Sequence, residues 1–296
     1  MKREPKLTKK SLLLVSPQTD SAEYLHISPE SAGWEFLNLS ARKMRQGEKW
    51  SFQTEENELA LVVLGGVCHV HSNRGTWENI GRRPDVFSGM PYTLYLPRRT
   101  KFTVEVISEN LDIVCGWVPT NEDHAPQLVT PDDVSIEIRG GDNFTRQING
   151  MIPPGFDCHR LVIVEVYTPS GNWSSYPGHK HDVHREDAEG NILEADLEEI
   201  YFFKIDKPEG YAYQRVYNDD KSLDELILAR NNHAVLVPEG YHPVVSAPGY
   251  TTYYLNFLAG TAQVLKATDD PEYAWVKDTW TEKDPRMPVV SMEMEK

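Results

Sequence analysis

The chain has 296 residues, which is enough to bury a large core and to form one or two domains. Aspartate and glutamate number 45 against 30 lysines and arginines, so the formal net charge at pH 7 is −15. This balance argues against an unaided binder of nucleic acid or of a membrane surface, because such proteins usually present a basic patch.

The cysteines and the apolar runs indicate a cytoplasmic protein. Cys68, Cys115 and Cys158 are isolated and form no CxxC pair, so we expect buried thiols in a reducing compartment. The apolar run at residues 12–15 is too short for a secretory signal. The longest apolar stretch, residues 59–70, is too short and too interrupted to cross a bilayer.

Short runs rich in Val, Ile, Tyr and Phe dominate the chain, and Gly, Pro, Asn and Asp punctuate them. This pattern is typical of an all-β sandwich or barrel. Helical patterns are scarce: we expect a short helical turn or a loop at residues 221–230 and an irregular segment from Pro271 onward. The expected strands lie at residues 59–64, 102–107, 161–167, 199–203, 211–217 and 250–258.

The two halves of the chain resemble each other weakly. Residues 59–66 are followed by Leu94-Tyr95-Leu96-Pro97, and residues 199–203 are followed by Val235-Leu236-Val237-Pro238. Each half therefore reads as a hydrophobic strand, a turn, a second strand and a proline turn.

We predict two jelly-roll barrels in tandem on this basis. The N-terminal barrel is expected in residues 1–125 and the C-terminal barrel in residues 126–296. Residues 119–126, with their prolines, Asn121 and acidic side chains, resemble a linker between them.

A candidate metal site lies in the second half. His179 and His181 are two residues apart, and residues i and i+2 of a strand project from the same face. Glu199 follows at the head of an apolar strand, and His242 lies in a Pro-x-Gly-x-His turn. Three histidines and one carboxylate suit one divalent ion, which could be Zn, Mn or Fe. Glu198 precedes the same strand and competes with Glu199 as the carboxylate ligand.

The first half has a His-x-His pair of its own, His69 and His71, but this pair is out of register with the pattern of the second half. Glu58 occupies the place that we take as equivalent to Glu199, and a lone carboxylate is a poor divalent site. We therefore expect the N-terminal barrel to carry no metal and both histidines to lie on its surface.

The order His-x-His, Glu, then His in a Pro-Gly turn resembles the cupin superfamily. It departs from the general pattern in the long acidic segment 182–198, which reads as an inserted loop or a lid, and in a turn one residue shorter than usual. Both departures resemble the 5-deoxy-glucuronate isomerase family of myo-inositol catabolism. The resemblance rests on Arg139-Gly140-Gly141-Asp142-Asn143-Phe144-Thr145-Arg146-Gln147, Ser174-Ser175-Tyr176-Pro177-Gly178-His179-Lys180-His181-Asp182, Leu197-Glu198-Glu199-Ile200-Tyr201, Gln214-Arg215-Val216-Tyr217, Val237-Pro238-Glu239-Gly240-Tyr241-His242-Pro243-Val244 and Ala247-Pro248-Gly249-Tyr250.

The resemblance implies a bicupin fold and an aldose–ketose isomerase that converts 5-deoxy-D-glucuronate to 5-dehydro-2-deoxy-D-gluconate. The related isomerase of 5-keto-4-deoxyuronate from pectin breakdown is the nearest alternative, followed by a cupin dioxygenase and a non-catalytic sugar-binding cupin. The expected partner is a small sugar acid, and a homo-oligomer is compatible with the sequence.

Such an isomerisation moves a proton between neighbouring carbons, so the site needs a group that transfers it. Glu198, Asp182 and Tyr201 are the candidates from the chain, besides a water molecule at the site. The sequence does not single out one of them.

The substrate also carries a carboxylate, which a guanidinium fork binds better than a point charge. Arg146 and Arg215 are the candidates, and Lys180 is less favoured because it should point away from the metal on a regular strand. Tyr254, on the strand after His242, is a further candidate for contact with substrate.

Overall fold

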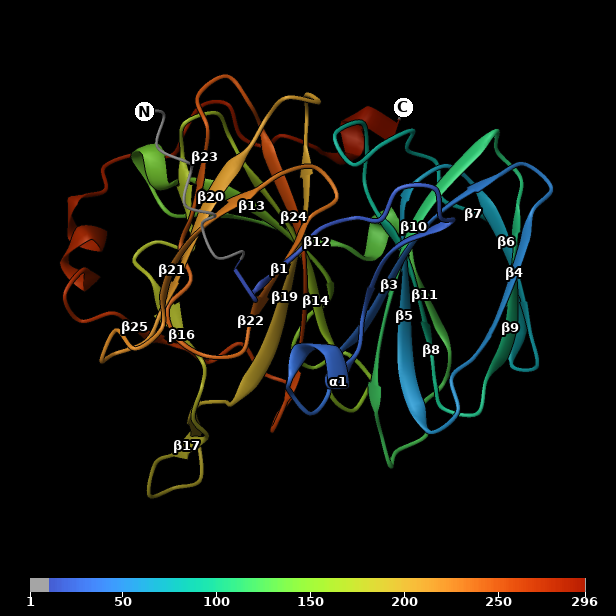
Figure 1. The fold of residues 1–296 in the computed structure, drawn as a ribbon, viewed down its shortest axis with the longest axis horizontal. Coiled ribbons are helices and arrows are strands. Elements are labelled where there is room, and N and C mark those ends of the chain that lie inside the picture. The colour runs from blue at the N-terminus through green and yellow to red at the C-terminus, as the bar shows by residue number, and fades with distance from the viewer. Residues whose placement is uncertain (1–10, 296) are drawn as a thin grey trace, which may run out of the picture.

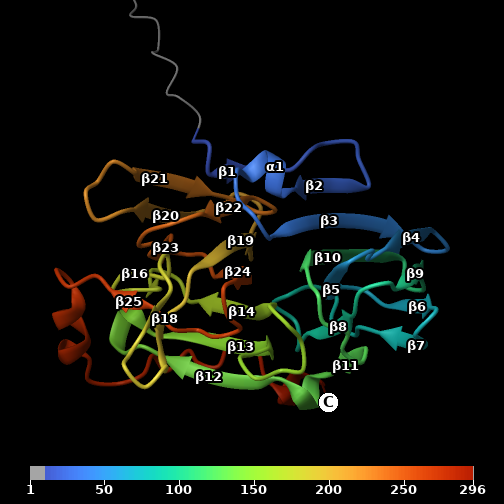
Figure 2. The ribbon, with the colours of Figure 1, turned by 90° about the horizontal axis from the view of Figure 1, so that it is seen from below.

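Antiparallel strands build almost all of the fold in the computed structural model, which describes residues 11–295. Figures 1 and 2 show two halves side by side, each made of a larger and a smaller sheet, with the two larger sheets facing each other at the centre. The all-β prediction is confirmed, and the four layers match the expected pair of barrels.

The N-terminal half holds a six-stranded sheet in the order β11-β8-β5-β10-β3-β2 and a four-stranded sheet in the order β4-β9-β6-β7. Its strands are β2 (Glu23–Ile27), β3 (Asn38–Arg45), β4 (Lys49–Gln53), β5 (Asn57–Gly65), β6 (Cys68–Ser72), β7 (Gly75–Ile80), β8 (Tyr92–Leu96), β9 (Lys101–Val106), β10 (Asn110–Pro119) and β11 (Gln127–Val129).

The C-terminal half holds a seven-stranded sheet in the order β1-β22-β19-β24-β14-β13-β12 and a four-stranded sheet in the order β15-β23-β20-β21. Their strands are β1 (Leu14–Val15), β12 (Ser135–Arg139), β13 (Arg146–Ile152), β14 (Val162–Thr168), β15 (Trp173–Ser174), β19 (Leu197–Ile205), β20 (Ala212–Tyr217), β21 (Asp224–Ala229), β22 (Ala234–Val237), β23 (Val244–Ser246) and β24 (Thr252–Gly260).

Two small strand pairs and short helical segments complete the fold. β16 (His179–Lys180) pairs with β25 (Thr268–Asp269), and β17 (Arg185–Glu186) pairs with β18 (Ile192–Glu194). The helical segments are α1 (Pro29–Ala32) and the 3-10 turns η1 (Pro131–Asp133), η2 (Asp142–Phe144), η3 (Ala274–Thr279) and η4 (Met292–Glu295). No helix in the described part of the chain is long and apolar enough to span a membrane.

The strands of the larger sheets are buried on both faces. In β5, Leu59 and Leu61 point into the N-terminal barrel, whereas Ala60 and Val62 pack against the other half. The two large sheets approach so closely that a Cβ on Gly116 would lie 2.3 Å from Cδ1 of Phe257. Contact between the halves is therefore a hydrophobic core of its own, and it fixes the two barrels relative to each other.

The structure places the transition between the halves later than predicted. β11, at residues 127–129, still pairs with β8 of the N-terminal half. Near the other end of the chain, β1 pairs with β22 in the C-terminal half. The expected division at residues 125 and 126 therefore falls before the last N-terminal strand, because these pairings are set by contacts distant in sequence.

The structure contradicts one smaller prediction and confirms two others. The prediction of a helical turn or loop at residues 221–230 is wrong, because residues 224–229 form β21 against β20. The three cysteines are buried free thiols, as predicted. His69 is partly buried and His71 is exposed on β6, which confirms their surface placement.

Candidate metal centre and active-site cavity

The C-terminal barrel contains a cavity of about 410 Å³. Strands β13, β14, β19 and β24 of the seven-stranded sheet form its floor, and residues 175–181 and 265–280 form its walls. The residues that line it are Arg139, Arg146, Ile148, Val164, Val166, Ser175, Tyr176, Pro177, His179, His181, Leu197, Glu199, Tyr201, Tyr254, Asn256, Leu258, Leu265, Lys266, Ala267, Asp269, Lys277 and Trp280.

His181 and Glu199 line this cavity, and the fully buried His242 lies next to Glu199 outside the cavity lining. His181, Glu199 and His242 each offer a ligand atom, and these atoms lie within 4.8 Å of one another. Oε2 of Glu199 lies 3.0 Å from Nε2 of His181 and 3.2 Å from Nε2 of His242. Strand alternation explains the arrangement, since Glu199 shares the inner face of β19 with Tyr201 and Phe203.

Hydrogen bonds to backbone carbonyls orient both imidazoles. Nδ1 of His181 donates to the carbonyl oxygen of Leu197 at 2.9 Å, and Nδ1 of His242 donates to that of Gly240 at 2.8 Å. Nε2 of each ring is thereby directed at Glu199. Metal-binding histidines characteristically show this pattern, in which the other ring nitrogen donates to a carbonyl or carboxylate.

The three atoms fit a divalent ion. Nε2 of His242 is buried and has no hydrogen-bond partner among the described residues, although it faces a carboxylate oxygen. A single proton between Glu199 and His181 makes that contact a hydrogen bond. The contact between Glu199 and Nε2 of His242 then has no proton. A cation at the centre would satisfy all three atoms, and imidazole and carboxylate donors suit Zn, Mn or Fe.

The fourth predicted ligand, His179, lies beside this group. Its ring centroid is 4.7 Å from that of His242 and 6.4 Å from that of His181, and it lines the cavity. Its nitrogen atoms do not belong to the group within 4.8 Å. The ligand set therefore stays a prediction, with three of its four residues in mutual contact range.

Electrostatics at this end of the cavity favour a neutral His179 and an ionised Glu199. Burial lowers the pKa of His179 well below its ordinary value, and the neighbouring His242 and His181 act in the same direction. Burial opposes ionisation of Glu199, but its contacts with His181 and His242 lower its pKa to about 2. Burial also opposes protonation of His181, yet its hydrogen bond with Glu199 raises the His181 pKa, so metal binding competes with a proton here.

Arg146, on β13, supplies a buried positive charge to the same cavity. The residue is 6% exposed, and its Nη1 has no hydrogen-bond partner within residues 11–295. Burial lowers the pKa of this guanidinium, although an arginine keeps its proton in proteins. An unpartnered buried guanidinium is costly unless a ligand completes its hydrogen bonds.

Tyr201 and Tyr254 carry hydroxyl groups into the cavity. Oγ of Ser175 lies 3.4 Å from each phenolic oxygen, and the hydroxyl of Tyr254 donates to Oγ of Ser174 at 3.0 Å. Burial and the nearby Glu199 raise the pKa of Tyr201 well above its ordinary value. Its phenol therefore keeps its proton and is available as a donor.

The other two predicted proton-transfer residues point elsewhere. Glu198 lies on the outer face of β19, where its carboxylate accepts hydrogen bonds from the backbone of residues 35–37. Asp182 accepts from the backbone N–H of Gly240 and pairs with Lys180. Neither side chain lines the cavity, so the structure argues against a direct catalytic role for both.

Two of the predicted substrate-binding residues are also engaged away from the cavity. Arg215 makes a bidentate ion pair with Asp224, with both contacts at 2.7 Å, on the smaller sheet. Lys180 pairs with Asp219 and Asp182 outside the cavity. Sequence could not reveal these partners, because Asp224 and Asp219 are brought close only by the folded sheet.

The cavity contains residues that sequence reasoning missed. Arg139 pairs with Arg146 across β12 and β13, and Asn256 shares one face of β24 with Tyr254, as strand alternation indicates, although it was not among the predicted site residues. Lys266 and Trp280 come from the C-terminal segment, which carries no motif that would indicate a site. By contrast, of residues 182–198, the expected inserted loop or lid, only Leu197 at the start of β19 lines the cavity, and residues 182–196 do not. They form the β17–β18 hairpin, which projects away from the barrel (Figure 1).

Strand register also corrects the comparison of the two barrels. Glu199 pairs with Val237 and Leu258, and the residue of β5 in the same place is Leu59, which pairs with Leu96 and Trp117. The expected equivalence of Glu58 with Glu199 is therefore wrong, and Glu58 corresponds to Glu198. The place of Glu199 is taken in the N-terminal barrel by an apolar core residue, Leu59.

Comparison with known proteins places these features in context. Residues 13–276 match the KduI/IolB family. The chain is 38% identical over 272 residues to the 5-deoxy-glucuronate isomerase of Geobacillus thermodenitrificans (strain NG80-2), with 91% of this chain and 97% of the relative covered. It is 33% identical over 274 residues to the 5-deoxy-glucuronate isomerase of Bacillus subtilis (strain 168), with 90% and 98% covered.

Two solved structures have a fold similar to that of this chain. An IolB-like protein from Salmonella typhimurium LT2 matches with a TM-score of 0.85 at 34% identity, over 89% of this chain and 98% of that one. The oxalate decarboxylase of Lactobacillus farciminis, in a formate complex, matches with a TM-score of 0.61 at 9% identity, over 88% of this chain and 89% of that one. The latter likeness concerns the fold alone.

Proposed function

Because this chain belongs to the KduI/IolB family, we propose that it is an aldose–ketose isomerase that converts 5-deoxy-D-glucuronate to 5-dehydro-2-deoxy-D-gluconate in myo-inositol catabolism. We further propose that the reaction depends on one divalent ion, Zn, Mn or Fe, bound by His181, Glu199 and His242 with His179 as the fourth ligand. A cytoplasmic location accords with the three free thiols.

One observation carries the metal-dependent part of this proposal. Nε2 of His242, Nε2 of His181 and Oε2 of Glu199 lie within 4.8 Å of one another, and His181 and Glu199 line the cavity that also holds the unpartnered guanidinium of Arg146. A sugar acid has a carbonyl at one end and a carboxylate at the other. The cavity thus offers one place for each end.

The residues of the cavity suit the individual demands of the reaction. A divalent ion bound at this site would polarise the substrate carbonyl and stabilise adjacent negative charge. Arg146 binds the carboxylate and orients the sugar, since a guanidinium matches a carboxylate in two parallel hydrogen bonds. Nδ2 of Asn256, which is buried without a partner in the described chain, donates to a sugar hydroxyl.

Of the predicted proton-transfer residues, only Tyr201 lines the cavity, and it can act as a proton donor, whereas the water molecule at the site accepts the proton from carbon. The protonated phenol of Tyr201 lies in the cavity on the same strand face as Glu199 and is suited to donate to a substrate oxygen. Trp280 and Leu265 cover the cavity from the C-terminal segment and limit the access of water.

The test is turnover by protein stripped with EDTA and reloaded with Zn²⁺, Mn²⁺ or Fe²⁺, followed by NMR under anaerobic conditions. We expect the metal-loaded protein to convert 5-deoxy-D-glucuronate, and the stripped protein and the His181→Gln variant to be inactive. His71→Gln, in the other His-x-His pair, is the matched control and should be fully active.

Three outcomes would contradict the proposal. Full activity of the stripped protein would exclude metal dependence. Conversion of 5-keto-4-deoxyuronate alone would replace the substrate with that of the related isomerase. A requirement for oxygen would favour the dioxygenase.

A further inference from the structure

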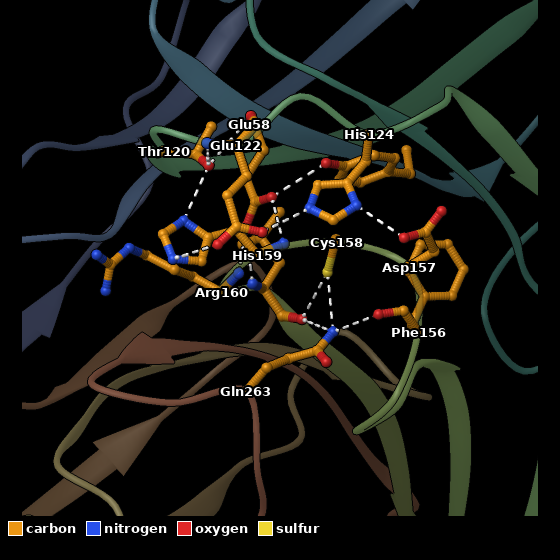
Figure 3. Close-up of polar contacts among 12 residues, drawn as sticks. Glu58, Thr120, Glu122, His124, Phe156, Asp157, Cys158, His159, Arg160 and Gln263 are labelled. Carbon is orange, nitrogen blue, oxygen red and sulfur yellow. Dashed lines mark hydrogen bonds and ion pairs between the residues drawn. The ribbon is translucent and has the colours of Figure 1, made fainter.

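Two carboxylates, one from each barrel, reach across the interface and bind the backbone of the other half. Glu58, the second residue of β5, accepts hydrogen bonds from the N–H groups of His159, Arg160 and Leu161 at 2.9, 2.7 and 3.0 Å. Figure 3 shows its side chain directed at the backbone of His159 and Arg160. The carboxylate is fully buried, so the contact joins the barrels without access for water.

Glu198 makes the equivalent contact in the opposite direction. It is the second residue of β19, and it accepts from the N–H groups of Phe36 at 2.9 Å and of Leu37 at 2.8 Å, as well as from that of Glu35. Residues 35–37 precede β3, just as residues 159–161 precede β14. The guanidinium of Arg160 lies 4.9 Å from the centre of the Phe36 ring and links the two sites.

The two contacts differ in the residue that comes next along the strand. After Glu58 comes Leu59, which lies in the core of the N-terminal barrel. After Glu198 comes Glu199, whose carboxylate belongs to the candidate metal centre. Successive residues of a strand point to opposite faces, so one short segment carries the interface contact outside and the ligand inside.

Leu197, on the other side of Glu198, is tied to a second ligand. Its carbonyl accepts the hydrogen bond from Nδ1 of His181 at 2.9 Å, and its N–H donates to the carbonyl of His181 at 2.9 Å. Residues 197–199 thus orient His181, contact the N-terminal barrel and supply Glu199. A shift of this strand end would move two ligands together.

We propose that Glu198 is a positioning residue, through which the N-terminal barrel holds His181 and Glu199 in metal-binding geometry. The inference rests on the metal centre of the proposed function. β19 begins at Leu197, where a strand is least restrained by its neighbours, and three hydrogen bonds to a charged acceptor fix that end. The N-terminal barrel thereby has a role in the active site without contributing a residue to the cavity wall.

The pair of equivalent carboxylates provides a matched experiment. Glu198→Gln and Glu58→Gln each replace a carboxylate oxygen with an NH₂ group that faces backbone donors, so both should lower the thermal unfolding temperature. Only Glu198→Gln should weaken Mn²⁺ binding, by about 10–100-fold, as is usual when a group that supports a ligand is removed. Mn²⁺ affinity is measured by chelator competition, and the EPR spectrum of bound Mn²⁺ reports the altered coordination.

A measurement on the wild-type protein needs no variant. Coupling between two sites is reciprocal, so Mn²⁺ binding should in turn strengthen the contact of Glu198. Hydrogen exchange of the amides of residues 35–37 should slow when Mn²⁺ is added to the EDTA-treated protein. The amides of residues 159–161, held by Glu58, should change little and report any general stabilisation.

The results separate this inference from the metal centre itself. If the wild-type protein binds none of Mn²⁺, Zn²⁺ and Fe²⁺, both are overturned. If it binds Mn²⁺ but Glu198→Gln binds it equally well, or Glu58→Gln weakens binding as much, only the positioning role of Glu198 is overturned. Equal slowing of exchange at residues 35–37 and 159–161 would have the same meaning.

Discussion

Arg146 and Arg215 carry the same guanidinium in two different settings. Arg146 is buried in the cavity with Nη1 unpartnered in the described chain. In Arg215, Nε and Nη2 both donate to the carboxylate of Asp224. The sequence presented both as candidates for the substrate carboxylate. Their surroundings distinguish them, because only Arg146 lines the cavity, where its buried Nη1 can donate to a ligand.

This difference predicts unequal effects of the same substitution. Arg146→Gln should raise KM for the sugar acid by about 10–100-fold, since a hydrogen bond to a charged group contributes about 1.5–3 kcal/mol. Arg215→Gln, the matched control, should leave KM unchanged. Steady-state kinetics on both variants provides the test, and equal KM values would exclude Arg146 as the carboxylate-binding residue.

Glu198 and Glu199 show which properties of single residues the sequence can predict and which it cannot. Both acids precede the same apolar run, and strand alternation places them on opposite faces. We predicted Glu199 as the ligand, and the structure brings it together with His181 and His242. The partner of Glu198 lies at residues 35–37, too distant in sequence for any local pattern to indicate it.

Among the larger elements, the C-terminal segment contributes to the cavity wall, and the β17–β18 hairpin, part of the expected inserted loop or lid, does not. The sequence suggested that the hairpin segment is a lid, but the cavity walls come from residues 175–181 and 265–280. Residues 265–280 reach the site because β25 pairs with β16, the strand that carries His179. The ring of Trp280 packs near Phe144, with centroids 6.0 Å apart, and closes one side of the cavity.

Shortening the hairpin and truncating Trp280 should therefore have different effects on the kinetic constants. Replacing residues 187–191, the hairpin tip, with an Asn-Gly turn should leave kcat and KM unchanged, because an Asn-Gly turn closes a two-residue hairpin without strain. Trp280→Ala should raise KM by about tenfold, which corresponds to about 1.4 kcal/mol of lost contact. Kinetic constants of both variants decide between the elements, and a higher KM for the shortened hairpin would restore it as a lid.

β21 illustrates a wrong element prediction with a physical cause. Residues 221–230 include the acidic pair Asp224-Glu225, and the prediction there was a short helical turn or a loop. The strand forms because β20 offers a hydrogen-bonding edge, with Ala212 opposite Ala229 and Tyr217 opposite Asp224. Strand propensity depends strongly on such pairing, so the local sequence could not decide it.

At the scale of the whole molecule, the contact between the barrels includes a buried ion pair. Arg83 of the N-terminal half and Glu165 of β14 lie 3.0 Å apart, with side chains 1% and 0% exposed. Asn149 and Tyr167 donate further hydrogen bonds to Glu165. Removal of one charge would leave the other buried without its partner.

Glu165→Gln should accordingly lower the free energy of unfolding by about 3–5 kcal/mol, the usual cost of breaking a buried ion pair from one side. Glu56→Gln breaks the exposed pair with Arg99 and should change it by about 0–1 kcal/mol. Urea denaturation of both variants measures the difference. Similar losses in the two variants would show that the buried pair does not hold the barrels together.

The sequence by itself determined the all-β class, and it indicated a likeness of the two halves and His179, His181, Glu199 and His242 as candidate ligands. These features follow from local rules, since backbone geometry places alternate strand residues on one face and turn residues mark where strands end. Only the tertiary structure decided which charged residues have partners elsewhere, that residues 265–280 wall the cavity, and that Glu198 joins the barrels. Those outcomes depend on contacts between segments far apart in the chain, which form only when the large sheets pack against each other and strand pairing is complete.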